Sequence, residues 1–168
     1  MKDKEIYRNN EMIKEMVEMQ KALDESIYNG HGVEYNEERT YLALIDEIGE
    51  LTHELKAEWC WWKKTVNPVD NSKVLEELVD VWHFALSIYY HSTGKSCYER
   101  ITKLYLHNKN ADKNLPKIIQ SIIDTPLKTL ILRHMIDLTN ALNFTVEDVY
   151  EAYIKKNQIN YERLKNNY

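Results

Sequence analysis

Apolar side chains recur along this chain at intervals of three and four residues, which is the spacing of one face of an α-helix. Breaks in the pattern fall at residues 29–32, 67–68 and 93–95, each of which contains Gly, Pro or Asn. Pro116 is suited to open one helix, and residues 145–148 resemble a capping box that opens another. The pattern predicts helical segments at about residues 4–28, 37–62, 72–92, 98–105, 116–142 (with a break near 124–126) and 145–165. We therefore expect an all-α fold in which these helices form a bundle.

Composition supports one helical domain that spans residues 1–168. The chain has only 4 Gly and 3 Pro, which leaves little turn chemistry for a sheet, and it is 43% hydrophobic without a linker segment. No apolar run is long enough to span a bilayer, and the first ten residues contain no apolar signal segment. Two cysteines, Cys60 and Cys97, are too few for a disulfide framework. We expect a cytoplasmic protein without a membrane partner, and a net charge of −5 argues against nucleic acid as a partner.

Two predicted helices carry the same short pattern of apolar and acidic residues. Residues 44–51 and 74–81 both read apolar-apolar-acid-Glu-apolar-x-acid-apolar, and each copy places two acids three residues apart at the edge of an apolar stripe. The acids are Glu47, Glu50, Glu77 and Asp80. If the two stripes pack together, the carboxylates meet, and each pair at ~4 Å repels by roughly 1 to 4 kcal/mol. Such a cluster needs cations, and hard oxygen ligands favour Mg²⁺ or Mn²⁺.

Two other interpretations of these acids stay open from the residues alone. The acids could belong to two solvated helix faces that never meet. Glu50 with His53 and Asp80 with His83 also have the Glu/Asp-x-x-His spacing of di-iron bundles. The di-iron interpretation is disfavoured because no other predicted helix supplies an inward Glu.

Three tryptophans lie close together at the end of the second predicted helix. Trp59, Trp61 and Trp62 cannot all face one core, so at least one of them is expected to be exposed or to line a cavity. Lys63 follows directly, and a ring beside a cation suits a planar anionic ligand. The alternative is simple packing at the helix end.

The apolar stripe of the last predicted helix is interrupted by polar residues. Polar side chains on an inward line need partners, and together they could form a strip of donors for phosphate oxygens. The strip comprises Tyr153, Lys156, Asn157, Asn160 and Arg163. A frayed polar C-terminus would give the same pattern.

Several of these segments together resemble the all-α, dimeric dUTP diphosphatases, which are relatives of the MazG-type nucleotide pyrophosphohydrolases. The matching segments are residues 19–24, 47–51, 61–63, 77–84 and 153–163. The resemblance implies a MazG-like helical bundle with a central four-helix core and extra C-terminal helices. It also implies a homodimer, for which Trp82 and Leu86 are candidate interface residues, and hydrolysis of a deoxynucleoside triphosphate. The expected reaction is Mg²⁺-dependent attack of an activated water on the α-phosphate of dUTP, which gives dUMP and pyrophosphate, with dUDP as a further substrate.

The resemblance also implies roles for single residues. Glu47, Glu50, Glu77 and Asp80 would hold two or more Mg²⁺ ions, with Glu47 or Glu50 taking the proton of the attacking water. The phosphates would be held by Lys63, Lys156, Asn157, Asn160 and Arg163. The base pocket would use Gln20, Asp24, one of Trp59, Trp61 and Trp62, and His83.

Asp24 departs from the family pattern, because many members carry Asn at this position. An Asn amide both donates and accepts hydrogen bonds, whereas an ionised Asp only accepts them. Asp24 could accept from uracil N3–H or from the amino group of cytosine, so dCTP is the alternative substrate. An interaction protein without catalytic activity is the alternative outside the enzymes, and residues 93–142 show helices but no chemistry.

Overall fold

A computed structural model describes residues 2–101, 114–125 and 127–166, and the described residues form α-helices and short 3₁₀ turns without a strand. The helices are α1 (Lys2–His31), α2 (Glu37–Glu54), α3 (Lys56–Trp59), α4 (Asn71–Thr93), α5 (Cys97–Ile101), α6 (Leu115–Ile123), α7 (Ile131–Ala141) and α8 (Val146–Lys165). The expected all-α bundle is confirmed. Residues 102–105 of the short helix predicted at 98–105 lie outside the described residues.

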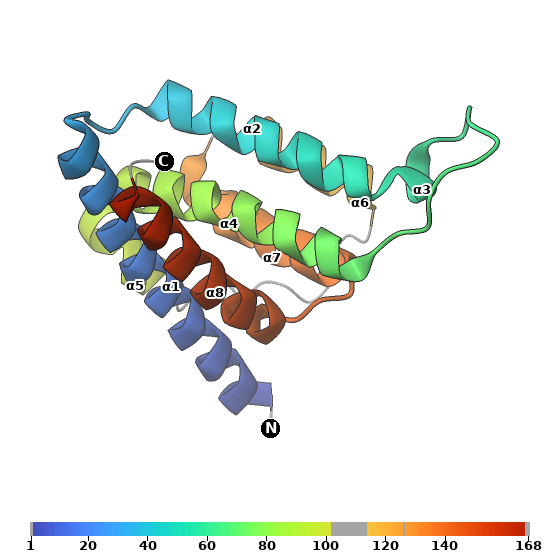
Figure 1. Ribbon diagram of the computed structural model, residues 1–168. Coiled ribbons are helices and arrows are strands. Elements are labelled where there is room, and N and C mark those ends of the chain that lie inside the picture. Colours follow the sequence, from blue (N-terminus) through green and yellow to red (C-terminus); the bar gives the residue numbers. More distant parts are fainter. Residues whose placement is uncertain (1, 102–113, 126, 167–168) are drawn as a thin grey trace.

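The central helix is α4, which packs against α1, α2, α7 and α8 (Figure 1). Its apolar side chains are buried around most of its circumference, as expected for a helix that is surrounded by others. Trp82 and Leu86 are both fully buried within the single chain, and the Trp82 indole N–H donates to Thr139 Oγ1 of α7 at 3.1 Å. The expectation that these two residues form a dimer interface is therefore wrong.

Two helix boundaries differ from those that the sequence predicts. The segment predicted at 37–62 ends as α2 at Glu54, and α3 is a separate short turn after Leu55. The indole N–H of Trp59 folds back and donates to the Thr52 carbonyl at 2.8 Å, which satisfies an end group of α2. Helix α4 begins at Asn71, one position before the predicted start, and its cap is Asp70, whose side chain accepts from the Ser72 amide.

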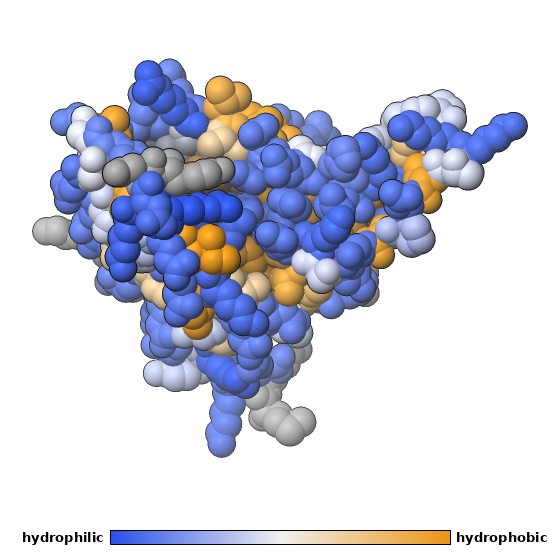
Figure 2. Space-filling view, in the orientation of Figure 1, coloured by the Kyte–Doolittle hydropathy of each residue, from blue (hydrophilic) through white to orange (hydrophobic). Residues whose placement is uncertain are grey.

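Other predicted boundaries are confirmed. The break near residues 124–126 separates α6 from α7, and Asn114 caps α6 in front of Pro116. Thr145 and Asp148 form the reciprocal capping box at the start of α8. The face seen in Figure 2 is mostly hydrophilic with isolated hydrophobic patches. Among the described residues, none of the helices has the length and apolar character that a membrane span requires.

Candidate functional site

The two acidic helices, α2 and α4, lie side by side (Figure 1). One carboxylate oxygen each from Glu47, Glu77 and Asp80 lies within 4.8 Å of the others, and all three side chains are half-buried. Glu50 is exposed beside them and, with Glu77, lines an open hollow of about 380 Å³. The packing of the two stripes thus brings together the acids that the repeated pattern singled out. We call Glu47, Glu77 and Asp80 the acidic cluster.

The surroundings of the acidic cluster disfavour the ionised form of its carboxyl groups. Burial, followed by the charges of Asp80, Glu50 and Glu77, raises the pKa of Glu47 to about 7. Burial also raises the pKa of Glu77 and of Asp80 above their usual values. A bound cation would favour the ionised form of these carboxyl groups, so the raised pKa values are consistent with a cation site.

Lys156 of α8 supplies the one cation that the described residues place in direct contact with the acidic cluster. Its Nζ donates to Asp80 Oδ2 at 2.5 Å and lies 4.0 Å from Glu76 Oε1. The side chains of Lys156 and Asp80 are only 15% and 16% exposed, so water screens this pair weakly. The Lys156 charge lowers the pKa of Glu47, of Glu77 and of Asp80, against the effect of burial.

A buried polar network lies between α1, α4 and α8. The Gln20 amide oxygen accepts from Tyr153 Oη at 2.6 Å, and it lies 2.6 Å from His83 Nδ1. The Gln20 amide nitrogen donates to Asp24 Oδ1 at 2.7 Å. All four side chains are at most 7% exposed. The structure thus joins the three residues that the family resemblance assigns to the base pocket, Gln20, Asp24 and His83, with Tyr153 of the polar strip on the last helix.

The far side of this network consists of two residues that the sequence analysis missed. Ser87 Oγ and Tyr90 Oη both donate to Asp24 Oδ2, at 2.6 and 2.8 Å. Ser87 follows His83 by four positions and Tyr90 follows Ser87 by three, so these side chains share one face of α4. That spacing was a usable signal for finding them.

Two polar atoms in this region are buried without a hydrogen-bond partner. They are His83 Nε2 and Asn157 Nδ2, and both residues are at most 7% exposed. His83 stacks on the Tyr153 ring with centroids 4.1 Å apart and an angle of 20° between the planes. Unpaired polar atoms at this depth are costly, so each one marks a place where a ligand group can bind.

The tryptophans lie apart from the network. Trp59, Trp61 and Trp62 are 38%, 88% and 58% exposed, on α3 and the loop after it, which projects beyond the end of α2 and away from α1 (Figure 1). The prediction that at least one ring is exposed is confirmed. Within the described part of the chain, the tryptophans therefore do not join the base-pocket candidates on α1.

The remaining basic and polar candidates lie on the loop after α3 and on α8. Lys63 lines a hollow of about 650 Å³ that shares His53 and Glu54 with the hollow beside Glu50. Arg163 is close enough to Asp80 to lower the pKa of its carboxyl, and Asn160 is half-buried on the same helix.

Neither histidine of the di-iron alternative joins the acidic cluster. His53 is exposed, and both of its ring nitrogens lie 3.0 Å from Lys56 Nζ. The ring of His83 faces Gln20 through Nδ1. The geometry of the described residues therefore argues against a di-iron centre.

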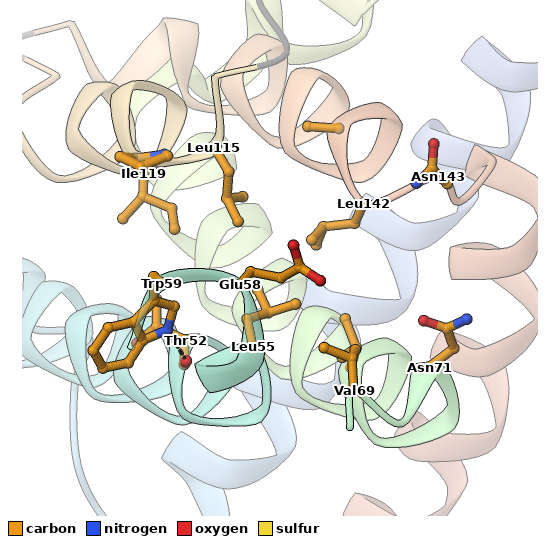
Figure 3. A pocket seen from close by; sticks show the side chains of 13 residues that line it. Thr52, Leu55, Glu58, Trp59, Val69, Asn71, Leu115, Ile119, Leu142 and Asn143 are labelled. Atoms are coloured by element: carbon orange, nitrogen blue, oxygen red, sulfur yellow. Dashed lines mark hydrogen bonds between the residues drawn. The ribbon is translucent and has the colours of Figure 1, made fainter. Parts of the chain in front are cut away.

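Another hollow, of about 760 Å³, lies elsewhere. Its walls come from α2, α3 and the segments around α6 and α7, and Figure 3 shows Leu55, Leu115 and Ile119 on them with the Glu58 side chain reaching inward. Trp59 borders this hollow, whereas Glu47 and Glu50 of α2 are not among the described residues that line it. Among the described residues that line this hollow, Glu58 is the only titratable one, so the hollow offers little chemistry.

The chain was compared with known proteins. A family model described as dUTPase matches residues 12–168. No curated protein matches the chain. The matched region includes the acidic cluster, Lys156 and the whole buried network.

Proposed function

Because the chain belongs to the dUTPase family and is thereby a dUTP diphosphatase, we propose that the acidic cluster and Glu50 form its metal site and that Mg²⁺ is the ion. The observation that carries this proposal is the convergence of Glu47, Glu77 and Asp80 with raised pKa values around a single lysine. Membership of an enzyme family also excludes the alternative of an interaction protein without catalytic activity.

The residues present fit a hard divalent cation. All donors in the acidic cluster are carboxylate oxygens, which Mg²⁺ prefers and for which Mn²⁺ is a suitable substitute. When bound, such ions neutralise the triphosphate, polarise its α-phosphoryl group and acidify a water. Two or more ions suit the number of carboxylates.

The protein's own groups have three tasks in this proposal. Glu47 or Glu50 takes the proton of the water that attacks the α-phosphate, and a pKa near 7 suits Glu47 for this task. Lys156 and Arg163 hold phosphate oxygens from α8, with Asn157 and Asn160 as further donors. Lys63, which lines the neighbouring hollow of about 650 Å³, is the candidate that contacts the phosphates from outside α8.

The buried network supports a base pocket. Gln20, His83 and Tyr153 provide a rigid wall with the unpaired acceptor His83 Nε2, which suits an N–H group of a pyrimidine. We assign uracil to this pocket, and we expect dUDP to be a further substrate. The alternative substrate is dCTP, because Asp24 could accept from the amino group of cytosine.

A panel of nucleotides tests the substrate. Hydrolysis of dUTP, dUDP, dCTP and dTTP should be compared with Mg²⁺ present, by separating the products. We expect dUMP from dUTP and dUDP, with dCTP at least about tenfold slower in kcat/KM, since its mismatched polar edge leaves buried groups unpaired. Thymine has the same polar edge as uracil, so dTTP tests only whether the pocket admits the extra C5 methyl group. A preference for dCTP would overturn the uracil assignment.

We also assign a homodimeric state. Three exposed tryptophans on α3 and the loop after it form an aromatic surface of the kind that is enriched at interfaces. A second copy seated there would cover them, and sedimentation at several concentrations tests this state.

The raised pKa of Glu47 predicts a link between protons and metal. Its value of about 7 means that a bound cation displaces roughly half a proton from this carboxyl at pH 7 and almost none at pH 9. Mg²⁺ affinity should therefore rise from pH 6 to pH 8 and then level off. Calorimetry at pH 7 in two buffers of different ionisation enthalpy measures the released protons. Equal Mg²⁺ affinity at pH 6 and pH 8 would contradict the metal site.

A further inference from the structure

Both carboxylate oxygens of Asp24 accept hydrogen bonds from other side chains of the protein. Oδ1 accepts from Gln20 Nε2 at 2.7 Å, and Oδ2 accepts from Ser87 Oγ at 2.6 Å and from Tyr90 Oη at 2.8 Å. Asp24 is 7% exposed, so these bonds lie away from water. A group whose oxygens are engaged in this way is poorly placed to contact a nucleobase directly.

The Asp24 carboxylate fixes the orientation of the Gln20 amide. In the observed orientation, Nε2 points at Asp24 and Oε1 points at Tyr153 and His83. If the amide were turned over, Oε1 would face a carboxylate oxygen at about 2.7 Å, and two acceptors would repel each other. Only a carboxylate accepts on both sides at once, since an Asn side chain has one acceptor and one donor group.

The Gln20 amide in turn fixes the tautomer of His83. Gln20 Oε1 is an acceptor 2.6 Å from His83 Nδ1, so Nδ1 must carry the proton of that hydrogen bond. Burial lowers the pKa of His83 to about 3, so the ring is neutral and carries only one proton. His83 Nε2 is therefore unprotonated and can accept a hydrogen bond, and in the described structure it is buried without a donor.

We propose that Asp24 is a positioning residue: it fixes the Gln20 amide and, through it, the Nδ1–H tautomer of His83, so that His83 Nε2 accepts from the N3–H of uracil. This inference rests on the proposed function, which assigns Gln20 and His83 to the base pocket. In this proposal Asp24 does not contact the base itself. Its role is to hold Gln20, which gives a reason for a carboxylate at a position where many family members carry Asn. Ser87 and Tyr90 belong to the same relay, because they hold the Asp24 carboxylate in place.

Nitrogen NMR tests the relay without metal or nucleotide. Long-range ¹H–¹⁵N spectra of the full chain, labelled at its histidines, distinguish the two neutral tautomers, and the signals of His83 are those lost in His83→Gln. We expect only Nδ1–H in the wild type at pH 7.5, and an Nε2–H population in Asp24→Leu, where Gln20 is free to turn over. An Nε2–H ring in the wild type would overturn the relay, as would a folded Asp24→Leu that keeps pure Nδ1–H.

A rescue variant separates positioning from a merely structural role. In Asp24→Leu/Gln20→Glu, the new carboxylate accepts from His83 Nδ1 and Tyr153 whichever way it turns, so the Nδ1–H tautomer should return. Failure of this return in a folded double variant would count against the relay. If Asp24→Leu does not fold, Gln20→Met tests the next step in the same way, because Nδ1–H loses its acceptor and Nε2–H should appear.

Kinetics then connect the tautomer to the substrate. Asp24→Leu should raise KM for dUTP roughly tenfold with kcat changed less than about twofold, since one neutral hydrogen bond to the base is lost. A fall in kcat at unchanged KM would overturn the link to the base. The two proposals fail separately: a correct tautomer without dUTP turnover would refute the proposed function alone, and turnover with the wrong tautomer would refute the relay alone.

Discussion

Replacing Glu47 with glutamine should abolish dUTP turnover and at the same time make the metal-free protein more stable. Glu47 contributes an oxygen to the acidic cluster, and the amide of glutamine neither carries charge for a divalent cation nor takes a proton from water. We expect kcat to fall by at least about 10³-fold, because in the proposed site Glu47 is a metal ligand and one of the two candidates that take the proton of the water. Steady-state rates with saturating Mg²⁺ measure this loss.

The gain in stability follows from the sign of the pKa shift. The pKa of Glu47 is raised from 4.5 to about 7, so ionisation costs the folded state free energy that is fully present above pH 7 and absent well below pH 4.5. The group is half-exposed, so screening reduces this cost to about 1 kcal/mol. For a chain of 168 residues, Glu47→Gln should then raise Tm at pH 8 by roughly 3 °C, with the difference vanishing towards pH 4.

Glu38→Gln is the matched control for both measurements. Glu38 is exposed on the same helix, roughly 13 Å along its axis from Glu47, in the first turn where an acid favours the helix dipole. Its loss should leave turnover unchanged and should not raise Tm. A Glu47→Gln variant that keeps the wild-type kcat would refute the metal assignment.

The sequence predicts the helices well where periodicity alone decides, and less well where tertiary contacts decide. The stripe that contains Leu44, Ile48 and Leu51 gave α2 correctly, since all three are buried. The end of α2 at Glu54 was missed because the apolar pattern continues through Leu55, and that pattern does not report the contact of the Trp59 indole with the Thr52 carbonyl at the helix end.

The candidate site shows the same division. The acids could be paired from their shared phase on two helices, because helical spacing fixes which side a residue faces. The contact between Lys156 and Asp80 spans 76 positions, and no local pattern reports such a distance. The interrupted stripe of α8 did identify Asn157 as an inward polar residue, which is buried as expected. The spacing of Ser87 from His83 placed it on the same helix face, but its partner Asp24 lies 63 positions away, and no local pattern shows that the two meet.

Replacing Lys156 with methionine should weaken catalysis while strengthening metal binding. Without a ligand, Lys156 Nζ stands 2.5 Å from Asp80 and offsets the charge of the acidic cluster. A divalent cation bound by Asp80 repels this ammonium group, which is then free to pair with a phosphate oxygen of the substrate. Removing the lysine takes away a competitor for the carboxylate and also a donor for the phosphates.

Two opposite changes are therefore expected in Lys156→Met, which keeps the length of the side chain. Mg²⁺ titration without nucleotide should show tighter binding than in the wild type, whereas kcat/KM for dUTP should fall by about 10²- to 10³-fold, as for the loss of one charged donor in an active site. Lys155→Met is the matched control, because Lys155 is the exposed neighbour on the same helix, and both quantities should stay at their wild-type values there. If Lys156 were only a structural counter-charge, Mg²⁺ would replace it and turnover would survive. Wild-type kcat/KM in Lys156→Met would therefore remove this residue from the phosphate site.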